Sequence, residues 1–402
     1  MKYTNVQFVG YSVSTHPGIY EDKSLYKFYP GLADDRADLE ARLALLERAV
    51  LLAGNFFSED EDVYRVFVAP EFFFRGACGA YAGPGMEVFL GNALDEILAR
   101  CGGKVDLAVW GTGLFADQAL NMEKASIRSK IFLGDDFLAV YQACKELRDK
   151  MGMPTPDLAG ILFHLDELEG MENGQAAQEL DPLASVVKEL LASCDSSAEI
   201  SVRNVSHISC GSGRRLAVQK QYKSKVDFIL NHYSGTGREK NNAGAFLQTI
   251  VRYPEIFASP GERKLEDGDP YCVFSEGGLK IGVEICLDHI RRRLVRSKAQ
   301  VDLQIVPSCG VEITPGSVSA RAGGYVFNCD GDYLLEDARN GVGSHTQLFR
   351  VEESAGAEKS AVLGRRIEPE RAVPVEHSAG SLLAHGAGEL HIYAPQPVNG
   401  RS

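Results

Sequence analysis

The sequence lacks the markers of several broad classes of protein. Its nine cysteines are an odd number, lie scattered between positions 78 and 329, and include no CxxC pair, so we expect neither a disulfide framework nor a structural zinc site. No apolar run approaches the roughly 18 residues of a membrane-spanning helix. The opening MKYTNVQFVG lacks the basic and then apolar segments of a secretory signal. These absences predict a cytoplasmic protein that does not contact membranes.

Positive charge is also scarce. The 402 residues include 42 Lys and Arg against 55 Asp and Glu, which gives a net charge of −13 and a pI of about 5.3. A nucleic-acid-binding protein would present a basic face, so nucleic acid is not an expected partner. The 45% content of hydrophobic residues is enough for a full core. This balance suits a soluble protein that acts on small molecules.

Apolar patterns near the start of the chain predict strands and a helix in alternation. Segments 5–13, 64–74 and 105–115 are expected to be strands, and 34–57 an amphipathic helix. The second strand is nearly all apolar, which is typical of a strand covered on both faces. This order favours an α/β layered fold. Further strands are expected at 279–286, 301–309, 324–332, 344–351 and 389–395, and a hairpin with the turn CGSG at 202–220.

Two long segments depart from this alternation. Residues 116–200 contain two helical patterns around a stretch rich in Gly and Glu, and we expect a helical insertion that forms a lid or an oligomer contact. From residue 352 the chain is charged and rich in Ala, Gly and Pro. The sequence therefore predicts a main domain over 1–351, which contains the insertion, followed by a C-terminal extension or arm over 352–402.

The stretch LKIGVEICLD at 279–288 carries the most specific chemical signal. Apolar residues alternate with Lys280, Gly282, Glu284 and Cys286, which predicts a strand that ends at the cysteine. A strand followed by a turn can present a sulfur nucleophile to a cleft. A free cysteine is more often a small buried apolar residue, so a nucleophile needs partner groups. Glu284 shares the Cys286 face, as a polar wall of the pocket or as the buried partner of an arginine.

Two other segments supply such partners. Glu71 follows Pro70 at the carboxyl end of an apolar strand, where desolvation would raise its pKa toward the range of a general base; an exposed glutamate at a strand end is the alternative. Lys220 ends the hairpin, where an ammonium could hold a developing oxyanion. Lys223 is the runner-up for this role, and a solvated run of charge that includes Lys225 is the alternative.

Taken in order, these segments resemble the carbon–nitrogen hydrolase (nitrilase) superfamily. That family combines a strand ending in PE, a hairpin that leads from an Asn to a catalytic Lys, a PE…G segment, a GxxIC strand with an Asp two residues after the Cys, and an apolar strand ending in Pro. The resemblance covers most of residues 1–350. The matching segments are PEFFF (70–74), Asn204 to Lys220, YPEIFASPG (253–261), GVEIC (282–286) with Asp288, and LQIVPS (303–308).

The resemblance implies a four-layer α–β–β–α sandwich, no metal or organic cofactor, and a homodimer or larger homo-oligomer. It implies that Glu71 is the general base, Lys220 stabilises the transition state and Cys286 is the nucleophile that forms a thioester. Glu255 is the expected substrate-positioning carboxylate. Phe72 and Leu287 are further expected substrate contacts, and Leu287 favours an amide over a nitrile because nitrile-cleaving members have Trp-Glu after the cysteine.

Several alternatives stay open at this stage. The same triad could serve a nitrilase or an amine-accepting acyl or amidotransferase, and a non-catalytic protein could use 116–200 as an interaction surface. His289 would allow a Cys–His pair in place of the Glu–Lys–Cys scheme. Asp288 could orient backbone N–H groups of the turn around the cysteine. The basic cluster IRRRLVR at 290–296 either recognises a carboxylate or phosphate or is a helix face paired with acids.

Overall fold

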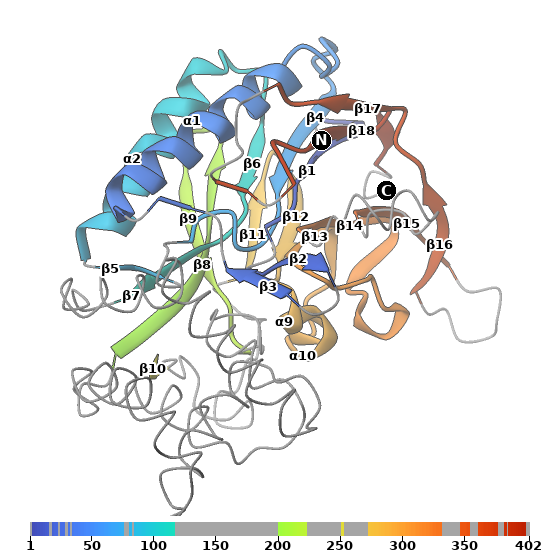
Figure 1. Ribbon diagram of the computed structural model, residues 1–402. Helices are drawn as coiled ribbons and strands as arrows, with labels where there is room; N and C mark the ends of the chain where they lie inside the picture. Colours follow the sequence, from blue (N-terminus) through green and yellow to red (C-terminus); the bar gives the residue numbers. More distant parts are fainter. Residues whose placement is uncertain are drawn as a thin grey trace, which may run out of the picture.

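The computed structural model describes residues 2–15, 18–22, 25–28, 31–32, 34–75, 80–82, 84–116, 200–222, 251–252, 272–331, 346–353, 361–376, 382–383 and 385–398. Apart from its two end residues, the insertion expected at 116–200 lies outside this set, as does the motif at 253–261. Over the described residues the chain is a mixed α/β structure with two main sheets and few helices (Figure 1).

The first sheet contains eleven of the described strands, and eight of them follow the order β17-β18-β1-β4-β6-β8-β7-β5. β1, β4 and β6 run parallel to one another, and β8 is antiparallel to β6. Its strands are β1 (Asn5–Ser12), β4 (Val63–Ala69), β5 (Tyr81–Ala82), β6 (Leu107–Trp110), β7 (Gly113–Ala116), β8 (Ile200–Cys210), β9 (Arg215–Gln219), β10 (Val251–Arg252), β17 (Arg371–Pro374), β18 (Glu389–Ile392) and β19 (Gln396–Pro397).

The second sheet has six described strands in the order β11-β12-β13-β14-β15-β16. β12, β13 and β14 are parallel, β11 and β15 pair antiparallel with the strands on either side of this group, and β16 pairs antiparallel with β15. A separate pair is formed by β2 (Gly18–Asp22) and β3 (Leu25–Phe28). The strands of the second sheet are β11 (Val273–Glu276), β12 (Leu279–Val283), β13 (Val301–Ser308), β14 (Ala320–Asp330), β15 (Gln347–Glu353) and β16 (Ala361–Ile367).

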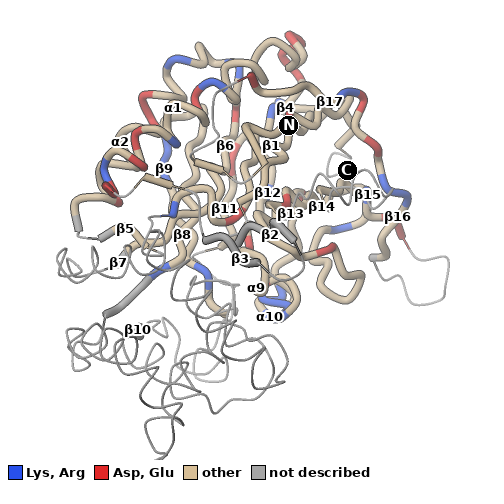
Figure 2. The backbone as a smooth tube through the Cα atoms, in the orientation of Figure 1, with Lys and Arg blue, Asp and Glu red and all other residues tan. Residues whose placement is uncertain are grey.

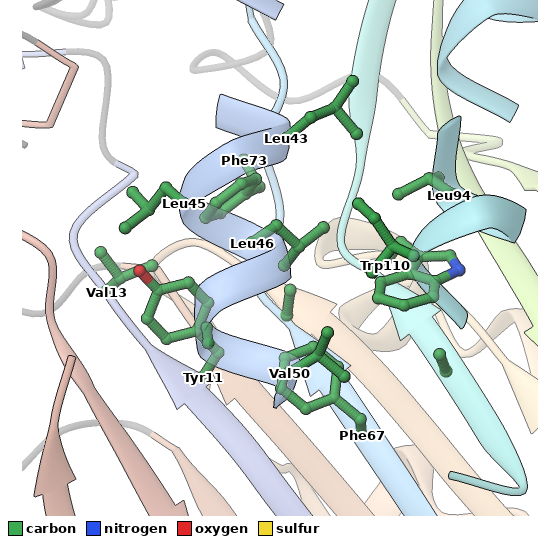
Figure 3. Packing of buried hydrophobic residues seen from close by; sticks show 14 of the residues in the cluster. Tyr11, Val13, Leu43, Leu45, Leu46, Val50, Phe67, Phe73, Leu94 and Trp110 are labelled. Carbon is green, nitrogen blue, oxygen red and sulfur yellow. The ribbon is translucent and has the colours of Figure 1, made fainter. Parts of the chain in front are cut away.

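Two helices, α1 (Asp35–Ala53) and α2 (Pro84–Arg100), cover one face of the first sheet (Figure 1). α1 begins where the Asp34 side chain accepts the Ala37 N–H at 2.7 Å, which satisfies one of the unpaired donors of the first turn. Its buried Leu and Val side chains face the sheet, and Figure 3 shows several of them next to aromatic residues of β1 and β4. None of the described helices is long and apolar enough to cross a membrane.

The other face of the first sheet packs against the second sheet. Along β1, Val9 and Tyr11 pack among the residues that meet the helices, whereas Val6 and Phe8 pack with residues of the second sheet. The rings of Phe8 and Phe327 lie 5.1 Å apart across this interface. Both faces of β1 and β4 are therefore buried, which explains why these strands are almost continuously apolar in sequence.

The described residues therefore form three layers, in which the helices α1 and α2 pack on the first sheet and the first sheet packs on the second. The helices that follow β12, α9 (Leu287–Ile290) and α10 (Arg293–Arg296), are single turns, and a short 3-10 helix occupies Pro315–Ser317. Apolar residues on the outer face of the second sheet pack against the segment after β13 and against β16. The second helical layer of the expected four-layer sandwich is not found among the described residues.

The C-terminal segment is part of both sheets, so the prediction of an arm over 352–402 is wrong. β16 pairs with β15 at the edge of the second sheet, and β18 pairs with both β1 and β17 in the first. The strand expected at 389–395 is confirmed as β18. The others were missed because β16 and β17 are edge strands that keep much of their surface exposed, so charged residues fit them without an apolar pattern.

We expect Leu390→Ala to lower the free energy of unfolding by about 2–5 kcal/mol, because Leu390 of β18 is fully buried against the core around α1. Denaturant unfolding of the whole chain measures this difference. Val88→Ala on α2 is the control, since Val88 is 64% exposed and its truncation should change stability by less than about 0.5 kcal/mol. Equal, small effects of the two substitutions would show that β18 is not part of the core.

Candidate active site

The three residues expected to carry chemistry each follow the end of a strand. Glu71 follows β4 of the first sheet, Lys220 directly follows β9, and Cys286 follows β12 of the second sheet. β4 ends earlier than expected, and the Glu71 N–H leaves the strand ladder to donate to the Ser308 carbonyl at the end of β13 (3.2 Å). This hydrogen bond ties the end of one sheet to the end of the other, which brings the segments together.

Glu71 and Lys220 form a buried ion pair. The Lys220 Nζ lies 2.8 Å from Glu71 Oε1, and neither side chain is exposed. Asn204 of β8 donates its side-chain N–H to the same oxygen at 2.9 Å, and the backbone carbonyl of Asn204 accepts the Lys220 backbone N–H at 2.8 Å. Asn204 therefore holds both partners. Lys223, the runner-up for the lysine role, lies outside the described residues.

The Cys286 thiol lies beside this pair. Burial raises its pKa well above the usual value of 9.0, and the charge of Glu71 and a hydrogen bond between the two side chains raise the pKa further. The positive charge of Lys220 and a hydrogen bond from the backbone of Cys309 act in the opposite direction. Burial is the largest of these effects, so the net direction favours the protonated thiol, which lies in hydrogen-bond contact with the Glu71 carboxylate.

The backbone around the nucleophile and the carboxylate is strained. β12 ends at Val283, three residues before the position that its alternation predicts, and Cys286 has a φ of 47°. Phe72, next to Glu71, has a φ of 60°. Non-glycine residues with positive φ cost free energy and occur often at functional sites. The Cys286 N–H donates to the Pro307 carbonyl at 3.0 Å, which holds the turn in place.

The turn after β13 supplies the backbone group that contacts the sulfur. The Asp330 carboxylate accepts the Ser308 hydroxyl at 2.9 Å and the Gly310 N–H at 2.7 Å. These two bonds flank Cys309, whose backbone forms a hydrogen bond with the Cys286 sulfur. Asp330 thereby fixes a donor that favours the thiolate form. The sequence predicted β13 correctly but assigned no role to this turn.

The three expected substrate contacts have different outcomes. Phe72 is fully buried, and its ring centre lies 5.6 Å from Lys220 Nζ, so in this structure it forms an apolar wall beneath the ammonium. Its N–H donates to the Thr112 hydroxyl at 2.9 Å, a contact that sequence patterns do not indicate. Leu287 is half-buried at the start of α9. Glu255 lies outside the described residues.

Glu284 is the buried partner of a histidine, not of an arginine. Its carboxylate lies 2.8 Å from His289 Nδ1 and accepts the Gln304 side-chain N–H at 2.7 Å. The other ring nitrogen of His289 accepts the Thr314 N–H at 3.1 Å. Both nitrogens are thus engaged away from Cys286, which removes the support for a Cys–His pair.

Asp288 also differs from its expected role. It accepts backbone N–H groups from Gln221 and Tyr222, which follow Lys220, and not from the turn around Cys286. It is paired with Arg293 at 2.8 Å, and both side chains are almost completely buried. Burial raises the pKa of Asp288, while Arg293 lowers it. The basic cluster at 290–296 is therefore not a uniformly exposed surface, because the side chain of Arg293 is buried and paired with Asp288.

Comparison of the chain with protein-family models finds no match, and comparison with curated proteins finds none either. Within the described parts of the chain, no group of three or more His, Cys, Asp or Glu side chains is arranged to hold a metal ion. The chemistry that the site can perform must therefore be argued from its own geometry. That geometry combines a thiol, a carboxylate that can take its proton, and an ammonium beside them.

We expect Glu71→Gln to lower the pKa of the Cys286 thiol, because the charge and the hydrogen bond of Glu71 both raise it. The rate of iodoacetamide labelling of the Cys286 peptide, measured by mass spectrometry against pH, reports this shift. Cys101 is an internal control, since burial raises its pKa to about 11 and Glu47 is the acid that acts on it. A Cys286 profile that stays unchanged or moves to higher pH would contradict the assigned contact.

Proposed function

We propose that this protein is a cysteine-dependent hydrolase of the nitrilase superfamily that cleaves a carbon–nitrogen bond, other than a peptide bond, in a small amide. The observation that carries the proposal is the buried Glu71–Lys220 ion pair in contact with the Cys286 thiol. Burying both charges has a desolvation cost of several kcal/mol per ion, which a purely structural site could avoid with apolar residues. A base and a cation at a sulfur nucleophile are the groups that acyl transfer needs.

The first half of the reaction uses all three side chains. Glu71 takes the proton of the Cys286 thiol, and the thiolate attacks the amide carbon. The negative charge that develops on the amide oxygen is stabilised by the Lys220 ammonium together with the backbone N–H that follows Cys286. Glu71 then returns its proton to the leaving nitrogen, the carbon–nitrogen bond breaks, and ammonia or an amine departs. A thioester on Cys286 remains.

The second half reverses these roles with water. Glu71 takes a proton from water, and the hydroxide that forms attacks the thioester carbon. The same donors stabilise the oxyanion, the carbon–sulfur bond breaks, and the thiolate receives the proton from Glu71. The products are a carboxylic acid and the resting thiol. The raised pKa of Cys286 supports this order, because a thiol that is protonated at rest needs a base in contact with it.

The proposal includes the architecture and surroundings of that superfamily. Its four-layer α–β–β–α sandwich contains, as three successive layers, the helix–sheet–sheet order of the described residues. A homodimer or larger homo-oligomer, a small-molecule amide as substrate and a cytoplasmic location belong to the same proposal. No metal or organic cofactor takes part in the steps above.

Trapping of the acyl-enzyme tests the proposal. We expect the wild-type protein, mixed with a panel of small amides, to gain the mass of an acyl group and to release the matching acid. Cys286→Ala should form no adduct, and Glu71→Gln should slow adduct formation by about 10²–10⁴-fold, the usual contribution of a positioned base. Intact-mass spectrometry at short times measures the adduct.

Cys101→Ala is the matched control, because Cys101 is a buried thiol at the end of α2 that does not enter the mechanism. It should acylate at the wild-type rate. Adduct on the Cys286→Ala variant would exclude the assigned nucleophile. Capture of the thioester by an added amine without release of acid would identify a transferase, and turnover of nitriles alone would identify a nitrilase. A Cys286 thiol that forms no adduct and labels no faster than Cys101 would favour a non-catalytic protein.

A further inference from the structure

The chain segment that carries Lys220 is held on both sides by one buried ion pair. Arg293 donates to the Gln219 carbonyl at 2.7 Å, on the N-terminal side of the lysine. Asp288 accepts the Gln221 N–H at 3.0 Å and the Tyr222 N–H at 2.8 Å, on its C-terminal side. Arg293 Nη1 lies 2.8 Å from Asp288 Oδ2, so the two side chains form one ion-paired unit. We call this unit the Asp288–Arg293 clamp.

The clamp connects the two sheets. The Lys220 segment continues β9 of the first sheet, whereas Asp288 and Arg293 belong to α9 and α10, the helical turns that follow β12 of the second. Asp288 lies two residues after Cys286, in the same turn. Any movement of the lysine backbone relative to the nucleophile must therefore break hydrogen bonds to this pair.

The composition of the pair favours a role in geometry over a role in stability alone. Removing two charges from water costs several kcal/mol per ion, and well-packed apolar residues would often stabilise the same contact equally well. Arg293 also differs in burial from the other arginines of the basic cluster at 290–296. Arg293 is 3% exposed, whereas Arg291, Arg292 and Arg296 are exposed, which gives α10 and its surroundings the basic colour seen in Figure 2. One arginine of the cluster has been placed in the interior, at a backbone carbonyl next to Lys220.

We propose that Asp288 and Arg293 are positioning residues, which set the Lys220 ammonium at the distance from Cys286 that the reaction requires. This inference rests on the proposed function, since Lys220 is given the part of stabilising negative charge. Neither residue contacts the reacting atoms. Both act through the backbone of residues 219–222.

The test uses the pH dependence of Cys286 alkylation by iodoacetamide in the full-length protein, which needs no amide turnover. In Asp288→Asn we expect the profile to move to higher pH by about 0.5–1 unit, because a displaced Lys220 stabilises the thiolate less. The sign is diagnostic. Loss of the Asp288 negative charge alone would move the profile to lower pH. Lys220→Met should give a shift at least as large in the same direction.

Arg293→Lys is the second variant, and it keeps the net charge. Any upward shift in this variant comes from geometry, since lysine cannot reach both the Gln219 carbonyl and the Asp288 carboxylate as the guanidinium does. Should Asp288→Asn fail to fold, this variant decides the question. A restored profile in the double variant that combines Asp288→Glu with Arg293→Lys would add support.

Asp302→Asn is the matched control. Asp302 is a buried carboxylate that pairs with Arg321 and accepts the Lys280 N–H at 2.7 Å, but it lies at the opposite end of β13 from the site. It should cost similar stability and leave the alkylation profile unchanged.

Three results would overturn the proposal: clamp variants whose profiles match the wild type while Lys220→Met shifts, a Lys220→Met profile without a shift, or an equal shift in Asp302→Asn. The outcome is separable from that of the proposed function. A wild-type protein that forms no thioester with the amide panel would refute the hydrolase, while the alkylation series would still decide whether the clamp positions Lys220.

Discussion

The candidate site depends on one ion pair that has no access to solvent. Glu71 and Lys220 lie 2.8 Å apart where the two sheets meet, and a buried charge left without its partner would cost several kcal/mol. Each therefore requires the other, and β4 and β9 must end at matching levels for the pair to form. Asn204 on the intervening β8 enforces that match, because one residue binds both the carboxylate and the lysine backbone.

The layers around this pair give it rigidity. Helices α1 and α2 close one face of the first sheet and the second sheet closes the other, so β4, which leads to Glu71, is buried on both sides. Such packing can hold residues in unfavourable backbone conformations. The positive φ angles of Phe72 and Cys286 occur beside the carboxylate and at the sulfur, one on each sheet. The fold thus maintains local strain at the two places where the proposed chemistry needs fixed geometry.

Sequence patterns located much of this arrangement. β1, β13, the hairpin of β8 and β9, and the segments carrying Glu71, Lys220 and Cys286 could be predicted because each shows a local apolar period or ends one. The contacts of Thr112 and Arg293 could not, since they join segments about 40 and 74 residues apart and leave no local signature. The strands β16 and β17 were missed because an edge strand needs little apolar surface, and their charged residues resembled a tail.

The position of β18 also constrains how the molecule can be made. This strand, from residues 389–392, pairs directly with β1, from residues 5–12, and completes one side of the first sheet. During synthesis the edge of β1 that β18 covers stays unpaired until residues 389–392 have left the ribosome. Contacts of such long sequence separation slow folding and prolong the exposure of nascent chains to aggregation. Until that pairing forms, the uncovered edge of β1 can pair with a strand of another chain.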